Sequence, residues 1–345
     1  MPAISPCQIL VIRLGRLGDV VLATPLLRAL HQAFPQAQVD WVIKQEFASL
    51  LQGHPWLHQV IPLDTSRGPA GLFRLAGELR RRRYDLVLDL HGIPRSYLLS
   101  GWSAAGLRRR YRKWPIRRRL LTGFGWNLLR GAPSVAERYF TAVEDFGIAP
   151  DHGAPELMPG AEARQESERL LAPWPRPRIG LAPGATRFTK RWPAESFAAV
   201  GADLAERFSG SVVVVGGPED RETAQEVLNR MSQQRPKLDL TGRLTLPQAV
   251  AVIQDLDLLI SNDTGLMHVA TADKTPVIAV FGPTTRELGF FPLGPAAKVI
   301  EHQDLSCRPC SVHGSDACPH GHFRCMKEIT PEQVSRATAP FLAKG

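Results

Sequence analysis

The chain has 345 residues, of which 44% are hydrophobic and 22% are charged. This composition is too apolar for wholesale disorder, and the length suits two ordinary domains better than one buried core. Lysine and arginine outnumber aspartate and glutamate by 42 to 33, so an acidic partner or surface has to be considered. No apolar run approaches the roughly 18 residues that cross a bilayer, and no charged leader with a cleavage site opens the sequence. We therefore expect a cytoplasmic protein that at most lies against a membrane.

Short apolar runs alternate with stretches of helical periodicity along the first half of the chain. The predicted strands are 9–12, 39–43, 60–63 and 86–90. The predicted helices between them are 22–34 and 72–82. This alternation is typical of a parallel sheet with crossover helices.

Proline and glycine become frequent around one short polar helix at 161–171, so we predict a linker at 156–177. The alternation then restarts with strands at 179–182, 212–215, 258–261 and 277–281. Helices are expected at 194–208, 220–231, 246–254, 266–272 and 330–342. The predicted fold class is α/β. It comprises two doubly wound Rossmann-like domains, 1–155 and 178–328, facing a cleft, with a C-terminal helix in 329–345. Ligands bind such folds at the carboxyl ends of the strands.

The loop after the first strand, from Arg13 to Asp19, opens a helix whose unpaired N–H groups favour an anion. Its glycines are spaced G-x-x-G, not G-x-G-x-x-G, and the second strand ends at Lys44, where a dinucleotide fold has an acid. Both features argue against a nicotinamide dehydrogenase. Asp19 is either the cap of a helix that begins at Val20 or a general base.

Two loops of the second half carry groups suited to a nucleotide. The loop 183–193 contains the hydroxyl of Thr186 and the mobile charge of Lys190, which suit a pyrophosphate, although a solvated basic loop is the alternative. Glu219 follows a run of valines, where an acid can bind a ribose diol. Either Glu219 or Asp220 is alternatively a first-turn acid of the next helix.

The segment from Ser261 to His268 again reads as strand, polar turn and helix. We expect Asp263 or Thr264 to cap this helix, and the N–H groups from Thr264 to Leu266 to face a phosphate. His268, one turn into the helix, is more often a packed core histidine than a catalyst.

Four of the five cysteines are close together near the end of the chain, with three histidines among them: Cys307, Cys310, Cys318 and Cys325. They offer enough soft ligands for a four-coordinate structural zinc ion, although the second pair is spaced too widely for a standard zinc ribbon. Free or redox-active thiols, an iron–sulfur site and disulfides are the alternatives, and disulfides are disfavoured in the cytoplasm. The segment is expected to order a loop near the cleft.

Basic residues concentrate between Arg67 and Arg138, where 17 basic residues face 4 acidic ones. Tryptophan and phenylalanine are interleaved with them, so this segment suits lipid phosphates and an anionic membrane surface. A solvated charged face is the alternative. No nucleic-acid recognition module accompanies the charge, so we expect no nucleic-acid partner.

Together, these loops resemble glycosyltransferase family 9, the heptosyltransferases of lipopolysaccharide inner-core assembly. The resemblance runs from Ile9 to about Thr330. It is carried by Gly18-Asp19, by Lys190-Arg191-Trp192-Pro193 and by Asn262-Asp263-Thr264-Gly265-x-x-His268.

The resemblance implies a GT-B architecture and a metal-independent, inverting transfer of heptose from ADP-heptose to a Kdo or heptose of a lipid A-Kdo type acceptor. Asp19 would be the general base, and Lys190 would hold the donor phosphates during catalysis. The other donor-binding residues would be Thr186, Glu219, Asp263, Thr264, Gly265 and His268. The acceptor-binding residues would be Arg16, Gly18, Arg95 and Arg117. No cofactor is required for such a transfer.

The implied location is peripheral, on the inner face of the inner membrane. Two other functions stay open: a transferase of the same fold with another nucleotide sugar, and a non-catalytic basic protein that binds lipid or phosphate.

Overall fold

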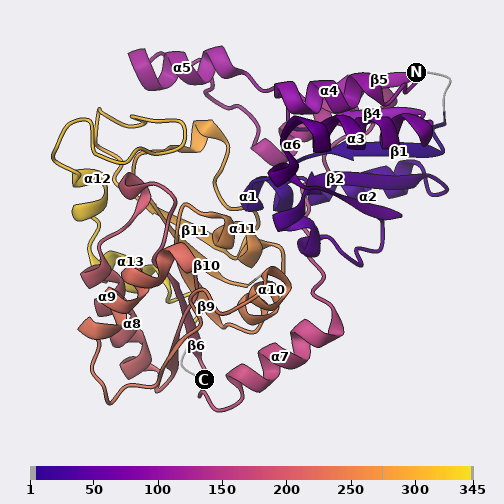
Figure 1. Cartoon of the computed structure of the whole chain (residues 1–345). Coiled ribbons are helices and arrows are strands. Elements are labelled where there is room, and N and C mark those ends of the chain that lie inside the picture. Colours follow the sequence, from indigo (N-terminus) through magenta and orange to yellow (C-terminus); the bar gives the residue numbers. More distant parts are fainter. Residues whose placement is uncertain (1–4, 274, 343–345) are drawn as a thin grey trace. The chain divides into compact units, whose positions relative to one another are not determined.

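The computed structural model describes residues 5–273 and 275–342. Residue contacts divide the chain into two compact units. The first contains the chain up to Trp114 together with Pro133–Met158, and the second contains Pro115–Ala132 and everything from Pro159 onward. Each unit is built on one parallel sheet (Figure 1). Among the described residues, no helix is both long enough and apolar enough to cross a membrane.

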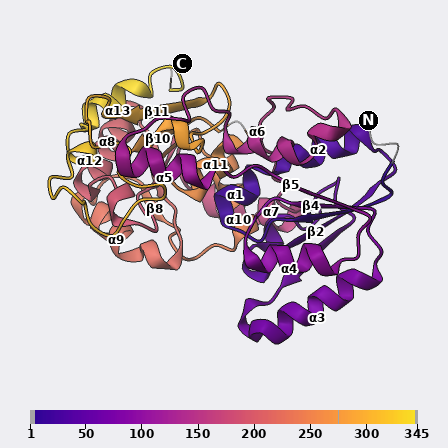
Figure 2. The ribbon, with the colours of Figure 1, turned by 90° about the horizontal axis from the view of Figure 1, so that it is seen from above.

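The sheet of the first unit has the order β3-β2-β1-β4-β5. Its strands are β1 (Gln8–Ile12), β2 (Gln38–Lys44), β3 (Gln59–Leu63), β4 (Leu86–Asp89) and β5 (Leu107–Arg110). Its α-helices are α1 (Leu17–Val21), α2 (Thr24–Ala33), α3 (Gly68–Arg81), α4 (Pro94–Trp102) and α6 (Val135–Tyr139). Figure 2 shows α3 and α4 on one side of this sheet and α2 on the other. Ile12 pairs with Asp89 in the register, so the loops after β1 and β4 leave the sheet next to each other.

The predicted helix 22–34 corresponds to α2, and a separate short helix, α1, precedes it because the chain turns between the two. Pro25 has no N–H to donate to the carbonyl oxygen of Val21, four residues earlier. The hydroxyl of Thr24 donates to that oxygen instead, at 2.8 Å. The turn therefore satisfies the carbonyl that a continuous helix would leave without its usual donor.

The sheet of the second unit has the order β11-β10-β9-β6-β7-β8. Its strands are β6 (Arg178–Ala182), β7 (Ser211–Val214), β8 (Lys237–Asp239), β9 (Leu258–Asn262), β10 (Val277–Phe281) and β11 (Ala297–Glu301). Its longer helices are α5 (Pro115–Phe124), α7 (Ala161–Leu171), α8 (Ala194–Arg207), α9 (Arg221–Arg230) and α10 (Leu246–Gln254). Three shorter ones follow, α11 (Gly265–Thr271), α12 (Arg324–Lys327) and α13 (Pro331–Ala337). In Figure 1, α8, α9 and α13 lie on one side of this sheet, and α10 lies with α7 on the other.

The described units differ from the predicted boundaries in two segments. The prediction included 115–132 in the first domain, whereas this segment groups with the second unit. Nη2 of Arg118 donates to the carbonyl oxygen of Leu288 at 3.4 Å, and Nδ2 of Asn127 donates to Oε1 of Glu287 at 3.2 Å. The predicted linker also contains α7, which packs on α10 of the second unit.

Candidate active site

Asp19 lies in the first turn of α1, directly after the loop that follows β1. Its Oδ2 is 2.5 Å from Nη2 of Arg13, and its Oδ1 accepts a hydrogen bond from the Tyr139 hydroxyl at 3.4 Å. The N-cap position of α1 belongs to Arg16, so Asp19 is not the cap of this helix. Its side chain is 20% exposed, which leaves a firmly held carboxylate open to solvent.

Arg13 is a buried partner of Asp19 that the sequence analysis did not single out. Its Nη1 donates to the carbonyl oxygen of Leu90 at 2.8 Å, and its own carbonyl oxygen accepts from Nε1 of Trp41 at 3.1 Å. Burial acts to lower the pKa of the Arg13 guanidinium, but Asp19 and the neighbouring tyrosines outweigh it and raise the pKa overall. Arg13 is therefore a permanent positive charge that orients the Asp19 carboxylate.

The loop after β4 lies next to the Arg13 loop and is shaped by the buried Asp89. Oδ1 of Asp89 accepts from the N–H groups of His91 and Gly92, both at 2.9 Å. Nδ1 of His91 accepts the N–H of Leu14 at 3.1 Å, which ties this loop to the loop after β1. Burial, followed by the charge of Arg13, lowers the pKa of His91 to about 4, so the imidazole is neutral.

The predicted acceptor-binding residues are divided between the two units. Arg16 is exposed at the start of α1, and Gly18 lies inside that helix. Arg95 is exposed in the first turn of α4, after the His91 loop. Arg117 is on α5 and belongs to the second unit, unlike the other three.

In the second unit, Lys190 and Asp263 form a close ion pair at the carboxyl ends of the neighbouring strands β6 and β9. Nζ of Lys190 is 2.7 Å from Oδ2 of Asp263, and both side chains are mostly buried. The Thr284 hydroxyl donates to the same carboxylate oxygen at 2.7 Å. The ammonium group therefore has a fixed position before any anion binds.

Asn262 holds the loop that carries Lys190. Its Nδ2 donates to the carbonyl oxygen of Pro183 at 2.7 Å, and its Oδ1 accepts the N–H of Trp192 at 3.0 Å. Asn262 is fully buried at the end of β9. This amide thus joins both ends of the β6 loop to β9, a positioning role that the motif alone did not indicate.

The expected side-chain cap of α11 is wrong. Thr264 is the N-cap residue, but its hydroxyl makes no cap hydrogen bond, and Asp263 faces Lys190 instead. Gly265 begins the helix and is partly exposed, whereas His268 is buried within it. The structure therefore brings Lys190, Asp263, Thr264 and Gly265 to one edge of the sheet.

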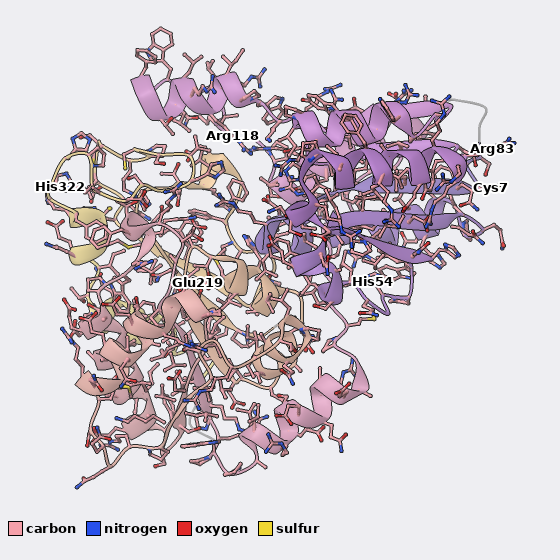
Figure 3. The ribbon with its side chains drawn as sticks, in the orientation of Figure 1. Cys7, His54, Arg83, Arg118, Glu219 and His322 are labelled. Carbon is pink, nitrogen blue, oxygen red and sulfur yellow. The ribbon has the colours of Figure 1, made fainter. Side chains whose placement is uncertain are left out.

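The two acids after β7 have different roles. Oδ2 of Asp220 accepts the N–H of Gly217 at 2.9 Å, so Asp220 is the acid that fixes the turn, and burial raises its pKa. Glu219 is exposed (Figure 3). Thr186 is likewise exposed, in the loop after β6. Because β7 neighbours β6, Glu219 follows the strand next to the one that leads to Thr186.

All four cysteines of the C-terminal cluster are free thiols, so the disulfide alternative is not seen. Sγ of Cys307 lies 3.8 Å from Nε2 of His322, and burial together with the nearby Cys310 raises the pKa of Cys325 to about 12. In the part of the chain that the structure describes, no three histidine, cysteine, aspartate or glutamate side chains form a group that could hold a metal. The zinc site stays a prediction.

The segment between these cysteines packs directly on the Lys190 loop. The N–H of Thr189 donates to the carbonyl oxygen of Ser315 at 3.0 Å, and the N–H of Ser315 donates to Oγ1 of Thr189 at 2.8 Å. A Cβ added to Gly314 would lie 2.8 Å from Cγ of Lys190. The cysteine-rich segment therefore orders the loop that holds the lysine.

Comparisons with known proteins identify the family of the chain. The family model described as "Glycosyltransferase family 9 (heptosyltransferase)" matches residues 72–319. Lipopolysaccharide heptosyltransferase 2 of Escherichia coli (strain K12) is 30% identical, over 95% of this chain and 96% of that protein.

Solved structures resemble the whole chain. The family 9 glycosyltransferase from Veillonella parvula DSM 2008 gives a TM-score of 0.82 at 24% identity, covering 97% of this chain and 96% of that one. The E. coli ADP-heptose lps heptosyltransferase II gives a TM-score of 0.76 at 26% identity, covering 97% of this chain and 98% of that one. These similarities confirm the expected GT-B fold. The chain is a glycosyltransferase and belongs to glycosyltransferase family 9, the heptosyltransferase family.

Proposed function

We propose that this enzyme takes a heptose from ADP-heptose and transfers it to a Kdo or heptose of the lipopolysaccharide inner core. The observation that carries the proposal is the Lys190–Asp263 pair, fixed by Asn262 at the carboxyl ends of β6 and β9. An ammonium group in that position suits a nucleotide pyrophosphate. Two matches from E. coli support the choice of sugar, nucleotide and acceptor, since one is named lipopolysaccharide heptosyltransferase 2 and the other ADP-heptose lps heptosyltransferase II.

The donor would bind to the second unit. As the bond to the leaving ADP breaks, negative charge grows on its phosphates, and Lys190 with the N–H groups of Thr264 and Gly265 would stabilise that charge. Asp263 already holds the lysine, so little rearrangement is needed at the moment of reaction. Glu219 would bind the ribose, and Thr186 would assist at the phosphates.

The acceptor would bind to the first unit, where Asp19 would act as the general base. Its carboxylate would take the proton from the attacking hydroxyl as this oxygen bonds to the anomeric carbon with inversion. Arg13 and Tyr139 hold the carboxylate by its two oxygens. Arg16 and Arg95, exposed on the helices after β1 and β4, would bind acidic groups of the lipid acceptor.

Transfer would need no metal, because Lys190 and the start of α11 supply the positive potential that a bound cation would otherwise provide. Activity is therefore expected to survive exhaustive chelation. Metal analysis of the purified protein tests the cysteine cluster separately, since a structural zinc ion would be detected at one equivalent per chain.

The purified enzyme would be incubated with ADP-heptose and either Kdo-bearing lipid A or its singly heptosylated form, and the products would be identified by mass spectrometry. We expect one added heptose and one released ADP per turnover, with UDP- and GDP-sugars inactive. Transfer from a UDP- or GDP-sugar would keep the fold and overturn the donor. Binding of ADP without any turnover would favour a non-catalytic protein.

A further inference from the structure

Large hydrophobic side chains are exposed together on α5 and the turn that follows it. Four side chains of this segment are the most exposed large hydrophobics among the described residues: Ile116 at 70%, Phe124 at 71%, Trp126 at 63% and Leu128 at 57%. Single exposed hydrophobic residues are ordinary, but a contiguous group marks a binding surface. The rings of Phe124 and Trp126 also contact each other, with centroids 5.8 Å apart.

The helix geometry places Ile116 and Phe124 on one face of α5, and Trp126 and Leu128 follow in the turn after it. Residues 116, 120 and 124 follow one another at intervals of four, which forms a continuous stripe on an α-helix. Ile116, Leu120 and Phe124 occupy the stripe, and Arg117 and Arg119 flank Leu120 at angles that place one on each side of it. Long arginine side chains beside an apolar stripe can reach charged groups while their stems cover apolar surface.

The opposite face anchors the segment to its own unit. Arg118 and Leu121 are buried, and the Arg118 guanidinium lies over the ring of Phe290, 5.4 Å from its centroid. Figure 3 shows Arg118 extending from the helix, and its contact with the carbonyl oxygen of Leu288 fixes the helix orientation. The apolar stripe is therefore held outward and does not arise from a loose segment.

The charge of the segment indicates which kind of partner binds this surface. Residues 115–132 contain four arginines and no acidic residue, and Arg119 and Arg130 are exposed beside the apolar side chains. An arginine-flanked stripe with a tryptophan and a phenylalanine fits the boundary between headgroups and acyl chains of an anionic bilayer. A nucleic acid would match the arginines but not the isoleucine and leucines.

We propose that the outer face of α5 and the following turn, formed by Ile116, Leu120, Phe124, Trp126 and Leu128 with Arg119 and Arg130, docks on the surface of an anionic phospholipid bilayer. This inference rests on the proposed function, because the lipid acceptor lies in such a surface. It adds the element that enters the membrane and the side chains that do so. Docking there would bring the enzyme to its acceptor without a membrane-spanning segment.

Vesicle sedimentation of the full chain tests the proposal. One set of vesicles combines phosphatidylethanolamine with phosphatidylglycerol, and a second contains phosphatidylcholine alone. We expect the wild type to bind the anionic vesicles at least about tenfold more tightly. The double variant Phe124→Ser with Trp126→Ser should lose about tenfold or more of that binding, because both rings leave the apolar boundary.

Matched variants distinguish specific docking of this surface from nonspecific hydrophobic binding to vesicles. Phe73 and Trp102 form another exposed aromatic pair, on α3 and α4, with centroids 5.4 Å apart. Phe73→Ser with Trp102→Ser should leave vesicle binding unchanged, whereas Arg119→Gln should reduce the preference for anionic vesicles. Lipids brominated along their acyl chains should quench wild-type tryptophan fluorescence more strongly than that of Trp126→Phe.

Absence of wild-type vesicle binding, or equal binding by the Phe124→Ser, Trp126→Ser variant, would overturn the proposal. A change from dimer to monomer in that variant, with vesicle binding intact, would assign the face to a second copy of the chain. ADP binding, measured in the same samples, keeps the two proposals distinct. A variant that loses vesicle binding but still binds ADP has lost only docking. Absence of ADP binding in the wild type would contradict only the proposed donor.

Discussion

Asp19 is the residue whose replacement tests the chemistry most directly. Asp19→Asn keeps the shape but cannot accept the proton, so kcat should fall by about 10²- to 10⁴-fold. The affinity for ADP, measured by calorimetry, should not change, because Lys190 and Asp263 are on the other unit. Tyr139→Phe removes only a hydrogen bond of 3.4 Å and should have a far smaller effect. Turnover by Asp19→Asn close to that of wild type would show that another group is the base.

Lys190 gives the complementary prediction. Lys190→Met keeps most of the side-chain length and loses the charge, so ADP should bind about 10- to 100-fold more weakly, as expected for a lost hydrogen bond to a charged group. The variant also leaves Asp263 without its cation, so its thermal unfolding must be measured beside the wild type. Unchanged ADP affinity in a folded variant would remove Lys190 from the donor site.

At the scale of elements, the cysteine-rich segment should influence donor binding through Gly314, which packs against the Lys190 side chain. Gly314→Ala places a Cβ against the Lys190 side chain, so the KM for the donor should rise while kcat changes less. Gly321→Ala is the matched control, because Gly321 also has a positive φ, of 71°, but its added Cβ would meet nothing within 4 Å. Equal effects of both substitutions in steady-state assays would mean that backbone strain, and not the contact with Lys190, causes the change in KM.

The sequence predicts the central strands well because they are short apolar runs, and β1, β2, β9 and β10 match their predicted ranges closely. It missed β5, since Leu107–Arg110 is mostly arginine and shows no apolar pattern. That strand lies at the sheet edge, where Nε of Arg110 meets Oδ2 of the buried Asp89 at 3.1 Å. Tertiary pairing, not local propensity, makes it a strand.

Local sequence pattern also predicted part of the candidate site. The residues that depend on the order of the strands were missed. Lys190 and Asp263 stand at strand ends beside turn residues, so local pattern identified both. Arg13 and His91 depend on β1 lying next to β4, and strand order cannot be read from periodicity. The expected 17-residue basic surface is also smaller than its sequence suggests, because Arg118 and Arg138 are buried. Further arginines form ion pairs, namely Arg67, Arg74, Arg82, Arg109, Arg110 and Arg112.

At the scale of the whole molecule, stability should fall as the pH drops below neutrality. Burial lowers the pKa of His54 from 6.5 to about 4, so unfolded chains bind a proton there that folded chains do not. This contribution is complete above the unfolded pKa and is lost as the pH falls from there toward the folded pKa. It amounts to about 2 kcal/mol between about pH 7 and pH 5.

Urea unfolding at both pH values would measure this loss. His54→Leu cannot take up a proton, so the difference between its two unfolding free energies should be smaller than in the wild type by that amount. His91 changes in the same direction and remains in both proteins. An identical pH dependence in wild type and variant would mean that His54 is protonated equally in the folded and unfolded chains.

Residues 115–132 belong to the second unit, although the residues on either side of them belong to the first. The chain therefore passes between the units three times, after Trp114, after Ala132 and after Met158. A fragment that starts at Pro159 therefore lacks α5, and Leu288, buried in the intact chain, would lose its contact with Arg118. Exchange of first units among relatives by one crossover near residue 158 would join α5 from one parent to a 286–290 loop from the other. Recombination that respects the fold needs three junctions, so chimeras joined at all three should unfold at higher temperature than chimeras made by the single crossover.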